Sequence, residues 1–227
     1  MPTANLSVLE LTNNRSLLFW VAFECLVTLI WLFSQFRIAA KWYAIARLVR
    51  LVTIPYLALL LGQISPRDMG LTGYDWSSSL SLGSLVMVAM LALWIGVRTV
   101  GMTANSDLPE QPLPERHRFA TWPNRGLLVL LSGGLELNWS FWRASGAQVL
   151  SNLFMPTQSP TYWGIALAFV IVLPDTLFAS TSHEGRLLNV AILIATSVLF
   201  LFTKNFWLCW ILHLLLQWTI TPLTEQA

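Results

Sequence analysis

Apolar residues occur along the chain in seven long runs that are separated by short polar stretches. An α-helix needs about 20 consecutive apolar residues to cross the ~30 Å hydrocarbon core of a bilayer, and each run approaches that length. The runs cover approximately residues 16–36, 42–64, 78–99, 126–150, 162–180, 187–203 and 206–223. The pattern therefore predicts an all-α, polytopic transmembrane helical bundle of about seven spans, within a range of six to eight.

The polar stretches between the runs indicate how the chain is organised. The longest connection contains four prolines and mixed charges, which is typical of an extended extramembrane linker rather than of a helix. We therefore expect one integral membrane domain over residues 1–227. It consists of a three-span part over 1–100, the Pro-rich loop over 101–124, and a core part over 125–223.

Composition agrees with a membrane protein and excludes a nucleic-acid binder. Hydrophobic residues make up 56% of the chain and charged residues 11%, whereas soluble domains contain about 25% charged residues. Mean hydropathy is +0.63. The formal net charge is only +2, which is too small to indicate a polyanionic partner. The lipid bilayer is the expected partner, together with other membrane-protein chains.

The positions of arginine and lysine predict an orientation. Residues 37–50 contain Arg37, Lys41, Arg47 and Arg50, and residues 98–125 contain four further arginines, whereas the intervening loop has Arg67 alone. Loops rich in Arg and Lys stay in the cytoplasm. We therefore expect loops 37–50 and 98–125 to be cytoplasmic and the N-terminus to lie outside, in a bacterial-type plasma membrane.

Polar residues within the runs are the candidates for chemistry, because each is unfavourable in hydrocarbon unless it is paired or solvated. Glu136 and Arg143 are seven residues apart and share a helix face, and His213 and Gln217 are four apart and project together. We expect a polar pocket built by the following residues: Glu136, Asn138, Arg143, His213 and Gln217. Its simplest interpretation is a set of internal ion pairs and hydrogen bonds that join helices.

Three stretches of the chain resemble a known family. Residues 199–217 read L-F-L-F-T-K-N-F-W-L-C-W-I-L-H-L-L-L-Q, residues 138–144 read N-W-S-F-W-R-A, and residues 67–76 read R-D-M-G-L-T-G-Y-D-W. Together they are similar to the CPBP family, the group of intramembrane metalloproteases that includes CAAX prenyl proteases and bacteriocin-processing (Abi) proteins. The resemblance implies a site in which paired glutamates and histidines activate a water molecule, with or without zinc.

The chain departs from this family at the positions that matter for catalysis. When Arg143 is placed on the motif arginine, Asn138 and Trp139 occupy the positions of the two glutamates, and neither side chain can act as a carboxylate base. Gln217 replaces the final Asn or Asp of the last motif. Glu136 is about 200° around the helix from position 138 but one turn before position 139, so its carboxylate could reach the same cavity.

Three functional hypotheses follow from these residues. The first is a catalytically degenerate CPBP-like protein that serves as a non-catalytic subunit or scaffold of a membrane complex. The second is an active intramembrane metalloprotease whose candidate catalytic residues are Glu136, His183 and His213. The third is a pigment or cofactor carrier in which His213 binds a metal-centred macrocycle. The first hypothesis requires no cofactor. Zinc or a macrocycle is an alternative that the sequence does not support, and no metal site is assigned.

Overall fold

The chain folds into a bundle of α-helices. The computed structural model describes residues 8–38, 40–104, 122–153, 160–178 and 183–220, and the described residues contain no strand. The helices are α1 (Val8–Ser34), α2 (Ala40–Leu60), α3 (Trp76–Ala104), α4 (Trp122–Leu153), α5 (Pro160–Phe178), α6 (His183–Thr203) and α7 (Phe206–Ile220), with a short 3-10 turn, η1 (Gln35–Arg37), after α1. The prediction of an all-α bundle is confirmed.

Five of these helices are long and apolar enough to cross a membrane. Their apolar windows are Ser16–Ser34, Trp42–Leu60, Trp76–Leu93, Pro160–Phe178 and Gly185–Thr203. This number is smaller than the seven spans that the sequence predicts, for two different reasons. Helix α4 is long but carries several polar residues, and α7 is apolar but has only 15 residues.

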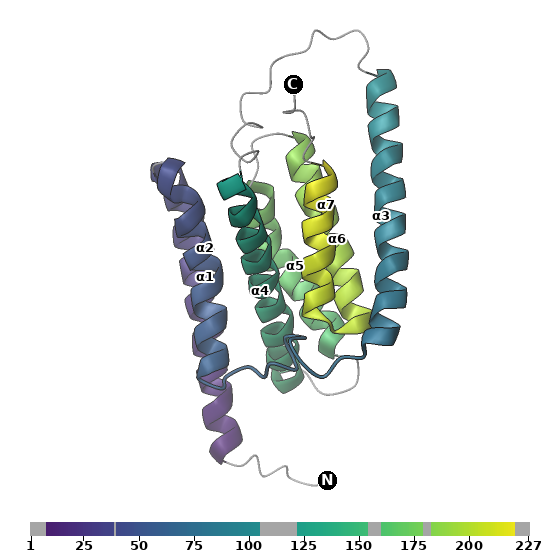
Figure 1. The fold of residues 1–227 in the computed structure, drawn as a ribbon. Coiled ribbons are helices and arrows are strands. Elements are labelled where there is room, and N and C mark those ends of the chain that lie inside the picture. Colours follow the sequence, from purple (N-terminus) through teal and green to yellow (C-terminus); the bar gives the residue numbers. More distant parts are fainter. Residues whose placement is uncertain (1–7, 39, 105–121, 154–159, 179–182, 221–227) are drawn as a thin grey trace.

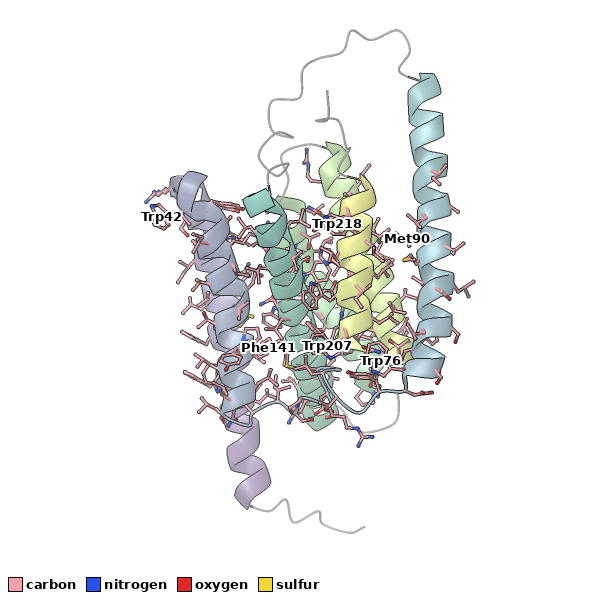
Figure 2. All side chains as sticks on the ribbon, in the orientation of Figure 1. Trp42, Trp76, Met90, Phe141, Trp207 and Trp218 are labelled. Carbon is pink, nitrogen blue, oxygen red and sulfur yellow. The ribbon has the colours of Figure 1, made fainter. Side chains whose placement is uncertain are left out.

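The distribution of side chains over the bundle is that of a protein surrounded by lipid. Large apolar residues such as Phe33, Leu85 and Phe202 are exposed on the outside, whereas charged residues such as Glu136 and Arg143 are buried. Exposed tryptophans mark both ends of the bundle: Trp42 and Trp218 lie near one end and Trp76 and Trp207 near the other (Figure 2). Tryptophan prefers the two interfaces of a bilayer, so this arrangement supports an integral membrane protein.

Helix α4 is the centre of the bundle. It contacts α1, α2, α5 and α7, whereas α3 lies at the opposite edge from the α1–α2 pair and contacts α6 and α7 (Figure 1). Successive helices run in opposite directions, so loop 61–75, the end of α4 and the turn between α6 and α7 lie at the same end. Because α4 is shielded by its neighbours, it tolerates polar residues that a lipid-facing helix would exclude.

Helices α4 and α5 approach each other closely through glycine. A Cβ atom added to Gly164 would lie 2.7 Å from the Cα atom of Ala147, and one added to Gly146 would lie 3.0 Å from the carbonyl oxygen of Gly164. Small residues allow two membrane helices to bring their backbones together. These glycines therefore determine how α5 sits against the centre of the bundle.

Loop 61–75 is held against the beginning of α7. The carbonyl oxygen of Gly70 accepts a hydrogen bond from the backbone N–H of Phe206 at 2.9 Å, and Leu71 accepts one from the indole of Trp207 at 3.2 Å. Gly70 has a φ of +72°, and an added Cβ would meet the carbonyl oxygen of Lys204 at 2.6 Å, so a larger residue would be strained here. The loop is thus an ordered cover over one end of the bundle.

Asp75 is the N-cap residue of helix α3, which begins at Trp76. Its carboxylate accepts hydrogen bonds from the backbone N–H groups of Ser77 and Ser78, at 3.0 and 3.4 Å, which otherwise have no partner within the helix. Hydrogen bonds from the side chain of Ser78 and from these backbone groups hold the pKa of the Asp75 carboxyl below its ordinary value. The polar residue that ends the loop therefore also caps the next helix.

Two expectations about the connections are corrected. Helix α3 extends to Ala104 and α4 begins at Trp122, so the linker is shorter than the predicted 101–124, and residues 105–121 lie outside the described residues. Arg50, which was counted with loop 37–50, lies within α2 and is buried. It is therefore a bundle residue rather than a cytoplasmic loop charge.

Candidate functional site

Polar side chains gather on two sides of helix α4. Glu136 and Arg143 point toward α6 and α7, whereas Asn138 points toward α1. Two residues along a helix correspond to a rotation of about 200°, which is why neighbouring polar positions serve different sides. Glu136 and Arg143 belong to the α4–α6–α7 cluster, and Asn138 belongs to the α1–α2–α4–α5 cluster.

The α4–α6–α7 cluster is centred on the carboxylate of Glu136. Its Oε1 lies 2.9 Å from Nδ1 of His213, and its Oε2 lies 3.5 Å from Nη1 of Arg143. The other terminal nitrogen of Arg143 donates hydrogen bonds to the hydroxyls of Thr196 and Ser197, both at 3.2 Å. Glu136 is fully buried and Arg143 is 2% exposed. Helices α4, α6 and α7 are therefore joined by one continuous polar network.

His213 has a partner at each ring nitrogen. Its Nε2 lies 2.9 Å from the amide nitrogen of Gln217, one turn later on α7. If this amide donates, Nε2 is the acceptor and Nδ1 carries the proton that is donated to Glu136, so the imidazole is neutral. Trp139 stacks on the histidine ring with a centroid separation of 5.2 Å and an interplanar angle of 22°. The ring is thus fixed by three neighbours.

The same network also rests on aromatic faces. The guanidinium carbon of Arg143 lies 5.1 Å from the ring centroid of Phe200 and 6.0 Å from that of Trp139. Both distances are within the range of a cation–π interaction, which is stronger where the cation is removed from water. Arg143 therefore has ionic, hydroxyl and aromatic partners inside the bundle.

The α1–α2–α4–α5 cluster is centred on Arg50. One of its terminal nitrogens lies 3.0 Å from Asp175, and the other donates to Thr28 at 2.7 Å and lies 3.8 Å from Glu24. The amide of Asn138 donates to Glu24 at 2.7 Å. Each of these side chains comes from a different helix, apart from Glu24 and Thr28, which are both on α1. The cluster therefore connects the N-terminal helix pair to α4 and α5.

The structure brings together four of the five residues of the predicted polar pocket. Glu136, Arg143, His213 and Gln217 form the chain of contacts just described. Asn138, which was grouped with them, belongs to the α1–α2–α4–α5 cluster instead, because it lies on the other side of α4. Helix α5, through Asp175, serves that second cluster as well.

The candidate catalytic set cannot be completed from the described residues. Helix α6 begins at His183, but the side chain of that residue lies outside the described part of the structure. Among the described residues, no group of three or more His, Cys, Asp or Glu side chains is arranged to hold a metal ion. What the described part of the site contains is one carboxylate and one imidazole hydrogen-bonded to each other.

Sequence reasoning missed the role of Arg50 and did not join it to Asp175. These residues are 125 positions apart, and local periodicity does not say which helices become neighbours. The available signal was an arginine inside an otherwise apolar run, which requires a buried anionic partner.

Comparisons of this chain with protein-family models, with curated proteins and with solved structures found no match.

Proposed function

We propose that this chain is a catalytically degenerate CPBP-like membrane protein whose seven helices all cross the bilayer and which acts as a non-catalytic subunit or scaffold. The observation that carries the proposal is the state of the acid–base groups. Both carboxylate oxygens of Glu136 and both ring nitrogens of His213 are already engaged by protein side chains. A general base must instead reach a water molecule or a substrate proton.

The residues at the two glutamate positions of the family motif support the same interpretation. The amide of Asn138 donates to Glu24 on another helix, and Trp139 stacks on His213. Both side chains join helices together, and neither supplies a carboxylate. In this proposal, the region that corresponds to the catalytic centre of the family serves to hold α4, α6 and α7 together.

Two structural features support the crossing of α4 and α7. Helix α4 has 32 residues, or about 48 Å at 1.5 Å per residue, and its charged residues are buried within the bundle. Helix α7 is short, but it lies against α3, α4 and α6 and runs between Trp207 and Trp218, which are near opposite ends of the bundle (Figure 2).

The non-catalytic proposal is tested by a peptidase assay on the purified full-length chain. Wild type is compared with Glu136→Ala and His213→Ala on prenylated and leader-type peptides, with Asp68→Asn as a control at an exposed carboxylate. We expect no turnover in any of them. Turnover in wild type and Asp68→Asn that is lost in both other variants would overturn the proposal.

The proposal that the chain is a subunit is tested by measuring the size of the particle that contains it. The chain is extracted from its native membranes in mild detergent and compared with the same chain produced alone. We expect the native extract to contain a stable assembly larger than the isolated 25.6 kDa chain in its micelle. A monomer in both preparations would exclude a role as a stable subunit.

The hydrogen bond between Glu136 and His213 is the one observation that favours an active intramembrane protease, because a paired carboxylate and imidazole can transfer protons. The assay above decides between the two functions. The macrocycle alternative gains no support, since an axial ligand requires a ring nitrogen and both nitrogens of His213 are hydrogen-bonded.

A further inference from the structure

A cavity of about 370 Å³ lies at the end of the bundle where loop 61–75 covers the helices. Its walls come from the ends of α4 and α6, from the beginning of α5 and from the loop, and Arg143 lies at its inner wall. The volume is within the range of small-molecule sites. The cavity is thus a candidate binding site to which neither the acid–base pair nor the family resemblance assigns a ligand.

Positive charge dominates the lining. The cationic residues are Arg67 from the loop, Lys204 from the turn after α6, and Arg143 from α4, whereas Asp68 is the one acidic lining residue. Arg143 is neutralised by Glu136. Within the described part of the chain, the side chains of Arg67 and Lys204 have no hydrogen-bond or ion-pair partner. Two cations against one carboxylate leave a net positive charge at the mouth.

Uncharged groups in the wall are also suited to an anion. Thr161 belongs to the first turn of α5, where backbone N–H groups and the positive end of the helix dipole favour negative charge. Thr72 adds a hydroxyl donor from the loop, whereas the hydroxyl of Ser151 already donates to the carbonyl oxygen of Gln148 at 2.8 Å. The wall therefore combines charged and neutral donors around one volume.

The position of the cavity indicates which anions it meets. Trp207, whose indole binds loop 61–75, and Trp76 at the beginning of α3 lie near this end of the bundle (Figure 2). Exposed tryptophans mark the level of the lipid headgroups. A basic pocket at this level is within reach of the phosphate of a lipid headgroup, to which Arg and Lys donate charge-assisted hydrogen bonds.

We propose that this cavity is a phosphate-binding site, with Arg67 and Lys204 as its principal ligands and Arg143 as a fixed inner wall. The phosphate belongs either to a lipid headgroup or to a soluble phosphate compound, and the chemistry of recognition is the same. The contacts of Gly70 and Leu71 with the beginning of α7 hold loop 61–75 in place, so that Arg67 lines the same cavity as Lys204. The site does not depend on whether the chain is catalytic.

Binding is measured on the full-length chain in a phosphate-free maltoside detergent by native mass spectrometry and by calorimetric titration. The probes are dihexanoyl phosphatidylglycerol, inorganic phosphate, and dihexanoyl glycerol as a lipid without phosphate. We expect saturable binding of at least one phosphate-bearing probe and none of dihexanoyl glycerol. Binding of the phospholipid alone assigns a lipid headgroup, whereas competition by inorganic phosphate assigns recognition of the phosphate itself.

The variants separate the site from a general charge effect. Arg67→Gln and Lys204→Asn each remove one positive charge. Asn is chosen at position 204 because the φ of Lys204 is +46°, which Asn tolerates. Each should weaken binding by about tenfold or more, the loss expected for a charge-assisted hydrogen bond. Asp68→Asn should tighten binding, and Arg37→Gln, an exposed arginine beyond the end of α1, should leave it unchanged.

Folding is checked by monodisperse elution of each variant. Arg67→Gln is the decisive one, because Arg67 is exposed and its side chain has no hydrogen-bond or ion-pair partner among the described residues. Equal affinity in wild type, Arg67→Gln and Arg37→Gln would overturn the proposal, and so would binding of neither phosphate-bearing probe or weaker binding by Asp68→Asn.

Discussion

At the scale of single residues, the two buried arginines in the described part of the chain each contact a carboxylate, one on the same helix and one on another helix. Arg143 pairs with Glu136, and Arg50 pairs with Asp175. A buried pair adds little stability over an apolar replacement, but removing one partner leaves an uncompensated charge and is strongly unfavourable. We therefore expect the Arg50–Asp175 pair, which joins α2 to α5, to act mainly by disfavouring other packings of these two helices.

The first prediction concerns the pair of Glu136 and Arg143. Glu136→Gln keeps the size of the side chain but leaves the guanidinium of Arg143 without its counter-ion, and it should lower the free energy of unfolding by about 3–5 kcal/mol. The double variant Glu136→Gln/Arg143→Met should recover a large part of this loss. Unfolding in mixed detergent and SDS micelles measures both, with Asp68→Asn as the control. A Glu136→Gln variant as stable as Asp68→Asn would show that the pair is unimportant.

The second prediction concerns Glu24. Its side chain is fully buried, one oxygen accepts a hydrogen bond from Asn138, and the other has no hydrogen-bond partner in the described structure. Glu24→Gln keeps an oxygen for Asn138 and should give nearly the same yield of folded protein. Glu24→Lys places a second cation beside Arg50 and should lower that yield severalfold. The measurement is the monodisperse fraction after detergent extraction, and equal fractions from both variants would contradict it.

Which residues can be grouped from sequence depends on whether they share a helix. Glu136 with Arg143, and His213 with Gln217, follow from spacing alone. Asn138 was assigned to the wrong group although the same arithmetic places it about 200° from Glu136. The contact of His213 with Glu136 and that of Arg50 with Asp175 depend on which helices are neighbours, and no local pattern contains that information.

At the scale of the helices, all seven predicted segments are found, but their ends differ from the apolar runs. Helix α1 begins at Val8 and α3 continues to Ala104, because a helix extends beyond hydrocarbon wherever its backbone hydrogen bonds can be made. Hydropathy identifies the part of a helix that faces lipid rather than its full length. Hydropathy also underestimates the ability of α4 to span a membrane. This helix lies at the centre of the bundle and contacts other helices, so it can carry polar residues that a lipid-facing helix would not.

The third prediction concerns the contact between α4 and α5. Gly164→Ala would place a methyl group against the backbone of Ala147, so α5 would have to move away from α4. Overpacking of this kind should lower the free energy of unfolding by about 1–3 kcal/mol. Gly126→Ala is the matched control, because an added Cβ there meets nothing within 4 Å. Unfolding curves in SDS should separate the two, and equal stability would show that the α4–α5 contact can shift without loss.

At the scale of the whole molecule, both ends of the bundle carry basic residues, which lie in different elements. One end carries loop 61–75 and the cavity with Arg67 and Lys204, and the other carries η1 with Arg37. Since Arg50 is buried, the positive charges that can orient this part of the chain are Arg37 in η1 and Lys41 and Arg47 near the beginning of α2. Orientation and span number are therefore best tested together.

The fourth prediction is that loop 61–75 lies outside the cell and the C-terminus inside. The loop follows two crossings from an external N-terminus, and five further helices reverse the side once more. In a background with Cys25→Ala and Cys209→Ala, we expect Thr72→Cys, at an exposed position of the loop, to react with a membrane-impermeant maleimide in intact cells. A fluorescent protein fused after Ala227 should fluoresce, because it folds in the cytoplasm.

The combination of results distinguishes the topologies. Labelling of Thr72→Cys with a dark C-terminal fusion would mean that an even number of helices cross after the loop, so that one of α3 to α7, most simply the short α7, does not span. If Thr72→Cys is protected in intact cells and is labelled only after lysis, the whole chain has the inverted orientation, with loop 61–75 in the cytoplasm. In the predicted orientation, neutral substitution of Arg37, Lys41 and Arg47 together should mix the two orientations, because these charges hold their end of the bundle in the cytoplasm.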